Sequence, residues 1–306
     1  MDANRRVLVN DVGPRDGLQN QATILSAAQR LELIRALARS GVASIEAGSF
    51  VSPKAVPAMA GAGQIFAELD TSGDVEFQAL IPNMKGYELA RAAGVRQTLL
   101  VVAATETMNQ ENVRMSVEQS MNVAGEIMSL AAADGIASYG CVAVAWECPF
   151  EGKTDLEQVR ALTSRYLEMG AAGVVLADTI GAANPGSVHD LMTILVNDHG
   201  AERLACHFHD TRAMGVANAY AALEAGIRRF DASVGGLGGC PFAPGATGNV
   251  ATEDLVMMLH QMGYETGIDL PLLMEAGRLA GELVGVESGG RAKTWRELQL
   301  QKGRSL

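Results

Sequence analysis

The sequence predicts an α/β fold, a TIM (β/α)8 barrel followed by a C-terminal helical extension. Short apolar runs alternate with longer amphipathic stretches through eight rounds, a pattern typical of parallel strands joined by helices. Eight such units close a barrel, and the 306 residues of the chain suffice for one barrel of roughly 250 residues with a short addition. We therefore expect a catalytic barrel over residues 1–268 and a helical extension with a tail over residues 269–306.

The expected strands are short, apolar runs. They are Val7–Val12, Ala43–Ala47, Phe77–Ile81, Gln97–Ala103, Ser138–Ala145, Gly173–Ala177, Leu204–Phe208 and Phe230–Val234. An open doubly wound sheet is the alternative, and a GxGxxG loop after the first strand would favour it, but the sequence has none there.

The expected helices have apolar residues at helical spacing. They are Ala27–Arg39, Lys85–Ala93, Val117–Ala133, Asp155–Met169, Ser187–Asn197, Val216–Ala225 and Glu253–Met262. Several are followed by a glycine, such as Gly41 and Gly170, which readily takes the left-handed conformation that ends a helix. One or two further helices are expected after residue 268, and then a polar tail from Ser288.

The composition limits the classes of partner. With 24 Lys and Arg against 35 Asp and Glu, the net charge is −11, which disfavours nucleic acid and means that an anionic substrate needs a local basic site. No apolar run is long enough to span a membrane, and the N-terminus does not resemble a signal peptide. The cysteines Cys141, Cys148, Cys206 and Cys240 form no CxxC zinc pattern. We therefore expect a cytoplasmic protein with reduced thiols.

Polar residues cluster where the expected strands end. Gly13–Gly17 follows the first strand, Asp178 follows the sixth, His207–Asp210 ends the seventh, and Gly235–Pro241 follows the eighth. Glu46 lies within the second strand. Because chemistry in TIM barrels takes place at the carboxyl ends of the strands, we expect these side chains to share one mouth of the barrel.

His207 and His209 are two residues apart on a strand and therefore face the same side. With Asp16 they could form an open site for a divalent metal, and oxygen donors beside two histidines favour Mg²⁺ or Mn²⁺ over zinc. The alternative is one hydrogen-bonded core histidine and one surface histidine.

Four further residues have two readings each. Arg15 could stabilise a developing oxyanion or pair with its neighbour Asp16, and Glu46, costly to bury alone, could orient Arg15 or simply form an ion pair with it. Cys240 lies in a glycine-rich loop suited to closing over a ligand, where it could act as an acid or base or be an inert thiol. Asn249 could bind the metal or cap a helix.

Four segments resemble those of the 3-hydroxy-3-methylglutaryl-CoA lyase family, and the similarity extends from about residue 7 to residue 285. The segments are Val12–Asn20, Ser49–Lys54, His207–Thr211 and Gly236–Pro241. The resemblance implies a lyase that cleaves a branched 3-hydroxyacyl-CoA, with a CoA thioester as substrate and acetyl-CoA and acetoacetate as products.

The resemblance also implies roles for individual residues. The metal ligands would be Asp16, His207, His209 and Asn249. Arg15 would stabilise the enolate oxygen of the departing acetyl-CoA, Glu46 would hold Arg15, Cys240 would be the acid or base, and Asp178 would lie near the substrate hydroxyl. Gln19 and Ser49 would join Arg15 in binding the substrate.

The chain departs from the family pattern on the fifth and sixth strands. Typical members have Arg-Gly-Tyr-Val-Ser-Cys where this chain has Tyr139–Val144, and Ser-Leu-Gly-Asp-Thr where it has Val175–Thr179. A related substrate such as citramalyl-CoA is therefore an alternative, because lost hydrogen bonds alter selectivity. A condensing enzyme acting on a 2-oxo acid and a binding protein without metal are two others. Alanine-rich helix faces are compatible with a homodimer.

Overall fold

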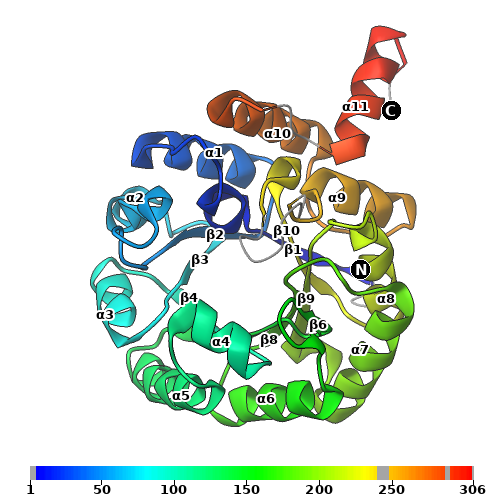
Figure 1. The fold of residues 1–306 in the computed structure, drawn as a ribbon. Helices are drawn as coiled ribbons and strands as arrows, with labels where there is room; N and C mark the ends of the chain where they lie inside the picture. Colours follow the sequence, from blue (N-terminus) through cyan, green and yellow to red (C-terminus); the bar gives the residue numbers. More distant parts are fainter. Residues whose placement is uncertain (1–4, 240–247, 287–289, 305–306) are drawn as a thin grey trace.

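The computed structural model describes residues 5–239, 248–286 and 290–304, and within these ranges eight parallel strands close into a barrel (Figure 1). Around the barrel the strands follow the order β1, β10, β9, β8, β5, β4, β3 and β2. Their bounds are β1 (Leu8–Asp11), β2 (Ser44–Ser49), β3 (Glu76–Leu80), β4 (Gln97–Ala103), β5 (Ala137–Ala143), β8 (Val174–Asp178), β9 (Leu204–Phe208) and β10 (Arg229–Ala232). The predicted TIM barrel is confirmed, and the alternative of an open sheet is wrong.

Helices form an outer ring around these strands (Figure 1). The predicted ones are α1 (Ala27–Arg39), α3 (Met84–Ala92), α5 (Val117–Ala133), α6 (Leu156–Glu168), α7 (Pro185–His199), α8 (Gly215–Glu224) and α9 (Thr252–Gln261). Strand and helix bounds agree with the sequence prediction to within two residues.

The ends of these helices follow local rules. Ser26 and Gln29 form a reciprocal capping box at the start of α1, which satisfies backbone N–H groups that have no partner within the helix. Gly41 and Gly170 follow α1 and α6 with φ of 87° and 89°, the left-handed conformation expected of glycine after a helix.

Several short elements have no clear sequence pattern. They are α2 (Ala62–Glu68), α4 (Glu106–Val113) and the two-stranded hairpin of β6 (Glu147–Cys148) and β7 (Gly152–Lys153). α2 begins after Gly61 without a side-chain cap and has only seven residues, too few for a helical pattern to be recognised.

Two C-terminal helices follow the barrel. α10 (Leu270–Val284) packs against α1 and α9, and α11 (Gly290–Gln301) contacts α9 and extends away from the barrel (Figure 1). The prediction of a polar tail from Ser288 is therefore wrong for residues 290–301. The Asp254 carboxylate of α9 accepts the backbone N–H groups of Arg291 and Ala292 at 3.0 and 2.6 Å, and this long-range contact caps a helix whose own sequence has little amphipathic pattern.

The apolar core has two parts. The larger lies between the strands and the ring of helices. A smaller cluster faces the inside of the barrel, because its members alternate along the strands with residues of the larger one; it contains Leu99, Cys141, Val175, Ala177 and Ala205. Among the described residues, no helix is both long and apolar enough to cross a membrane.

Candidate active site

A tight turn after β1 brings Arg15 and Asp16 to the mouth of the barrel. Residues Gly13–Gly17 form a single π-helical turn, and the backbone N–H of Gly13 donates to the Asp11 carboxylate at 2.9 Å. A Cβ atom on Gly13 would lie 2.7 Å from a methyl group of Val234. Only glycine therefore allows the turn to pack this closely against the end of β10.

Arg15 is buried and held between two carboxylates. Its Nη1 donates to Asp16 Oδ1 at 2.6 Å, and its Nη2 lies 2.8 Å from Oε2 of Glu46. Glu46 is fully buried within β2, and burial raises the pKa of its carboxyl to about 7 although Arg15 opposes the shift. Burial disfavours the charge of Arg15, but Glu46 and Asp16 outweigh it and raise the pKa of the guanidinium. The predicted contact between Arg15 and Glu46 is confirmed.

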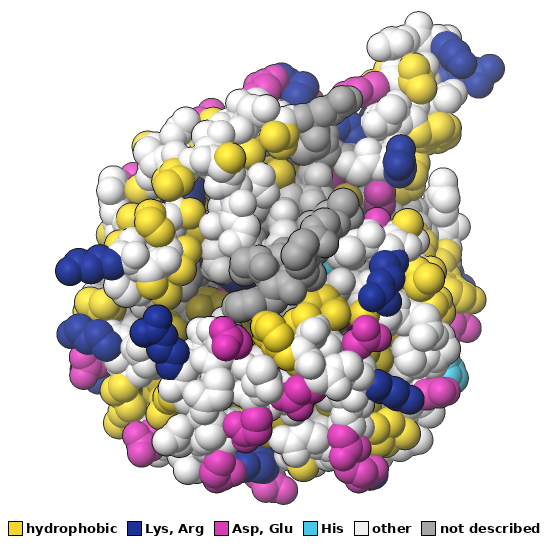
Figure 2. Space-filling view, viewed as in Figure 1, with side chains coloured by type: hydrophobic (Ala, Val, Ile, Leu, Met, Phe, Trp, Pro, Cys, Tyr) yellow, Lys and Arg dark blue, Asp and Glu magenta, His cyan; other side chains and the backbone are white. Residues whose placement is uncertain are grey.

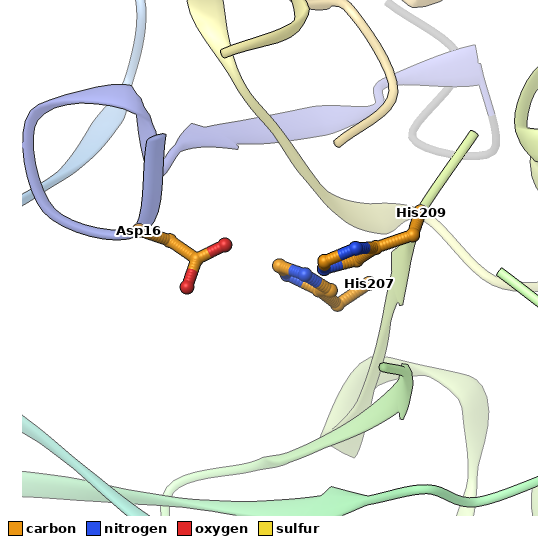
Figure 3. Close-up of side chains that lie close together, drawn as sticks. All are labelled: Asp16, His207 and His209. Atoms are coloured by element: carbon orange, nitrogen blue, oxygen red, sulfur yellow. The ribbon is translucent and has the colours of Figure 1, made fainter. Parts of the chain in front are cut away.

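Three of the four predicted metal ligands converge at the mouth of the barrel (Figure 3). The Asp16 carboxylate points from the turn after β1 towards the imidazoles of His207, in β9, and His209, just after β9, which lie side by side. One potential ligand atom from each residue lies within 4.8 Å of the others. The two ring centroids are 5.2 Å apart. The reading of one core and one surface histidine is therefore wrong, because both rings are buried and face Asp16.

The charges around this group favour metal binding. Burial opposes ionisation of Asp16, but Arg15 and the two histidines outweigh it and hold the pKa of that carboxyl well below its usual range. Burial and the neighbouring His207 lower the pKa of His209 to about 4. At neutral pH the site therefore offers an ionised carboxylate and a neutral His209, the protonation states that bind metals.

Asn249 lies against the same group. Its Nδ2 donates to Asp16 Oδ2 at 2.8 Å and to the backbone oxygen of Leu237 at 3.1 Å. Its Oδ1 is buried with no hydrogen-bond partner in the described part of the chain. Helix α9 begins after Ala251 without a side-chain cap, so the capping role considered for Asn249 is wrong.

The other predicted site residues have varied surroundings. Asp178 ends β8, and its two oxygens accept the backbone N–H groups of Ala182 and Ala183 at 2.9 and 3.1 Å; burial raises the pKa of this carboxyl to about 6. Ser49 ends β2 and is buried, whereas Gln19 is half-buried. Cys240 lies outside the described residues.

Sequence reasoning missed the residue behind His207. Oδ2 of Asp231 in β10 lies within hydrogen-bond distance of Nδ1 of His207, at 3.1 Å, and Asp231 also outweighs the effect of burial to raise the pKa of that imidazole. A charged residue inside the apolar run Phe230–Val234 could have indicated this role, as Glu46 did within β2.

Helix α9 anchors the segment that follows β10. The carboxyl group of Glu253 is fully buried, and the backbone N–H of Gly235 donates to it, lying 3.1 and 3.0 Å from its two oxygens. Asp11 nearby accepts the hydroxyl of Thr252 at 2.7 Å. Burial raises the pKa of Glu253 to about 8 and that of Asp11 to about 6.

We expect Glu253→Gln to change how stability depends on pH. Between the ordinary pKa of 4.5 and the folded value of about 8, the native state keeps a proton that the unfolded chain releases. The free energy of unfolding of the natural protein should therefore fall as pH rises through this range, by at most ~1.4 kcal/mol per pH unit from this group. Urea unfolding at pH 5, 6, 7 and 8 should show a flatter profile for the variant. Parallel profiles would contradict the expectation.

The whole chain resembles known proteins. The HMGL-like family model matches residues 6–280. A hydroxymethylglutaryl-CoA lyase of Pseudomonas mevalonii is 42% identical over 94% of this chain and 95% of its own length. An (R)-citramalyl-CoA lyase of Chloroflexus aurantiacus is also 42% identical, over 88% of each chain.

A solved structure agrees with these sequence comparisons. An HMG-CoA lyase from Acinetobacter baumannii, in complex with coenzyme A and 3-methylmalate, superposes with a TM-score of 0.92 and 39% identity over 100% of this chain and 97% of its own. Both the fold and the sequence similarity thus extend over nearly the whole chain. The chain therefore belongs to the HMGL-like family, the lyase family that its four sequence segments predict.

Proposed function

We propose that this protein is a metal-dependent lyase that cleaves a carbon–carbon bond of a branched 3-hydroxyacyl-CoA. The first candidate substrate is 3-hydroxy-3-methylglutaryl-CoA, which would give acetyl-CoA and acetoacetate. The observation that carries the proposal is the convergence of Asp16, His207 and His209 beside the buried Arg15, in a chain that matches the HMGL-like family.

The residues present fit a divalent metal, which we propose to be Mg²⁺ or Mn²⁺. Asn249 Oδ1 and Nδ1 of His209 are buried without a hydrogen-bond partner among the described residues, and such atoms are rare unless a ligand occupies them. Asp16 and Asn249 supply oxygen donors, and the two histidines supply nitrogen donors. A cation held there would make the 3-hydroxyl of the substrate more acidic.

The protein's own residues then direct the bond cleavage. We propose that the Asp178 carboxylate takes the proton of the hydroxyl. As the bond between C2 and C3 breaks, the hydroxyl oxygen becomes the ketone oxygen of acetoacetate, and the electron pair of the broken bond forms the enolate of the acetyl thioester. We propose that Arg15 stabilises the enolate oxygen, because a guanidinium fixed between Asp16 and Glu46 need not reorganise during the reaction. Cys240, in its glycine-rich segment, would supply the proton that bonds to C2. We further propose that Gln19, Ser49 and Asp178 contact the substrate.

The side chains inside the barrel suggest which acyl groups the enzyme accepts. The cluster inside the barrel is apolar, and Cys141 within it lies close enough to Arg15 and Glu46 for their charges to affect the pKa of its thiol, which burial raises. Cys141 and Val175 stand where typical family members have tyrosine and serine. We therefore propose that the 3-substituent of the substrate is apolar and that chains longer than methyl are accepted.

The charge of the surrounding surface also fits an anionic thioester. Figure 2 shows acidic side chains along the lower rim of this face, while Lys and Arg side chains gather at its left, where α2 and α3 lie. Such a basic region supplies the local positive charge that an acidic protein needs to attract the phosphates of CoA.

A substrate panel tests the proposal. Purified enzyme with Mg²⁺ or Mn²⁺ should release acetyl-CoA from 3-hydroxy-3-methylglutaryl-CoA, and a homologue with a longer 3-alkyl chain should also be cleaved; citramalyl-CoA is the third substrate. EDTA should abolish the release, and added metal should restore it. Absence of turnover with every thioester would show that the proposal is wrong.

The variant Cys240→Ala separates a lyase from a condensing enzyme. We expect it to lose acetyl-CoA release while keeping Mn²⁺ affinity, because the thiol is proposed to move a proton and not to bind the metal. Condensation of acetyl-CoA with a 2-oxo acid that persists in this variant would favour the condensing enzyme.

The cytoplasmic location and the homodimer stay predictions, the latter to be tested by sedimentation.

A further inference from the structure

A row of polar side chains crosses four neighbouring strands behind the candidate metal site. Strand register pairs Asp231 with His207, Asn10 with Asp231, and Asn10 with Ser44. Paired residues on adjacent strands point to the same side of a sheet, so the row forms one layer inside the barrel. Its members come from β2, β1, β10 and β9, far apart in the sequence.

Hydrogen bonds connect this row from end to end. The Ser44 hydroxyl donates to Asn10 Oδ1 at 2.9 Å, and Asn10 Nδ2 donates to Asp231 Oδ1 at 2.9 Å. The other oxygen of Asp231 lies 3.1 Å from Nδ1 of His207. All four residues are at most 9% exposed, and hydrogen bonds between buried groups are electrostatically stronger than the same bonds in water.

We infer that Asp231 is a positioning residue that fixes the tautomer of His207, with Asn10 and Ser44 fixing Asp231. The carboxylate only accepts hydrogen bonds and therefore keeps the imidazole proton on Nδ1. The lone pair of Nε2 is then free and aimed at the group formed with Asp16 and His209. The effect of Asp231 on metal affinity rests on the proposed metal site, but the tautomer of His207 can be measured without metal.

The near-isosteric variant Asp231→Asn removes this control. Asn10 donates to the Oδ1 side of residue 231, so the new amide presents its NH₂ group to His207 and moves the imidazole proton to Nε2. If the side-chain amides of Asn10 and residue 231 both rotate instead, residue 231 presents its amide oxygen to His207. The imidazole proton then stays on Nδ1, but its acceptor no longer carries a charge. We expect Mn²⁺ affinity to fall by about 10- to 100-fold in either case, the range known for such outer partners of metal-binding histidines.

The double variant Asn10→Asp/Asp231→Asn exchanges the two side chains and keeps their total charge. Residue 10 would then accept from both Ser44 and the amide of residue 231, which turns the amide oxygen towards His207. We expect Mn²⁺ to bind at least about threefold more tightly than to Asp231→Asn alone. A purely structural role predicts no such recovery, because the double variant disturbs more of the buried row.

Asp134→Asn is the matched control. It changes an aspartate that follows α5 on the outer layer and accepts hydrogen bonds from Tyr87 and Arg91, far from His207. Its Mn²⁺ affinity should stay within about threefold of the natural protein. Asp231→Ala is less suitable, because Asp231 borders a cavity of about 30 Å³ at the other end of the barrel, large enough to admit water.

Two measurements decide the inference. Mn²⁺ affinity by electron paramagnetic resonance should follow the order natural protein, double variant, Asp231→Asn. Nitrogen-15 NMR of the metal-free natural protein, which has five histidines, is recorded at a pH where the His207 ring is neutral and should show its single proton on Nδ1. A proton on Nε2, or an Asp231→Asn variant that binds Mn²⁺ as tightly as the natural protein, would overturn the inference. If the natural protein binds no Mn²⁺, the proposed metal site fails instead, and the tautomer still tests Asp231.

Discussion

Replacing Arg15 by Gln should lower kcat by about 10³-fold or more at temperatures where the variant stays folded. Loss of a single donor to a developing oxyanion lowers kcat by roughly 10²- to 10³-fold, and Arg15 brings a full charge as well. Its guanidinium is buried and bonded to Asp16 at 2.6 Å and to Glu46 at 2.8 Å, so it is already oriented before substrate binds. The measurement is kcat for acetyl-CoA release at saturating Mg²⁺.

Two variants show whether this loss belongs to the chemistry. Arg15→Lys keeps the charge, but a single ammonium cannot reproduce both arms of the fork, so we expect an intermediate kcat. Arg30→Gln removes another buried arginine, one that bonds to the backbone oxygen of Ala60. It should lower stability without lowering kcat at temperatures where the protein stays folded. A kcat for Arg15→Gln within tenfold of the natural enzyme would contradict the proposed role.

Replacing His209 by Ala should weaken Mn²⁺ binding by about 100-fold or more. Loss of a residue that only bonds to a metal-binding histidine weakens metal binding by about 10- to 100-fold. Loss of a histidine that binds the metal itself should weaken it at least as much. Nδ1 of His209 is buried with no hydrogen-bond partner in the described residues. Its pKa of about 4 keeps the ring neutral above pH 5. The neutral ring therefore has a nitrogen that can bind a metal ion, and no described protein atom occupies that position.

The activity of His209→Ala should recover in part when Mg²⁺ is raised, because Asp16, His207 and Asn249 remain. His260→Ala is the matched control, since that histidine bonds to Thr266 on the outer layer at 2.7 Å and should leave metal affinity unchanged. Isothermal titration with Mn²⁺ compares the three proteins. Equal affinity for the natural protein and His209→Ala would show that His209 is not a ligand.

Much of the fold could be predicted because its pattern is local and repeated. Each strand is a short apolar run, each helix has its own apolar face, and Gly41 and Gly170 mark helix ends. α11 escaped prediction because a carboxylate on another helix, Asp254, caps its first turn. Its own sequence has too little apolar periodicity to distinguish a helix from a polar tail.

The candidate ligands were predictable for a similar reason. In a parallel barrel the carboxyl ends of all strands face one mouth, so the sequence alone indicated that Asp16, His207 and His209 would meet. The resemblance added Asn249, and the structure replaced its capping alternative with a contact to Asp16. The pairing of Arg15 with Glu46 also followed, because a buried carboxylate inside a strand needs a cation.

The sequence by itself determined that the fold is a barrel, that the candidate active site lies at the carboxyl ends of the strands, and which family of lyases the chain belongs to. Only the tertiary structure decided which buried groups stand behind the ligands. Asp231 meets His207 and Asn10 because strand register places them side by side, and register depends on how the whole barrel closes. No local pattern contains that information, since the partners of a strand residue lie on other strands, with intervening chain of any length.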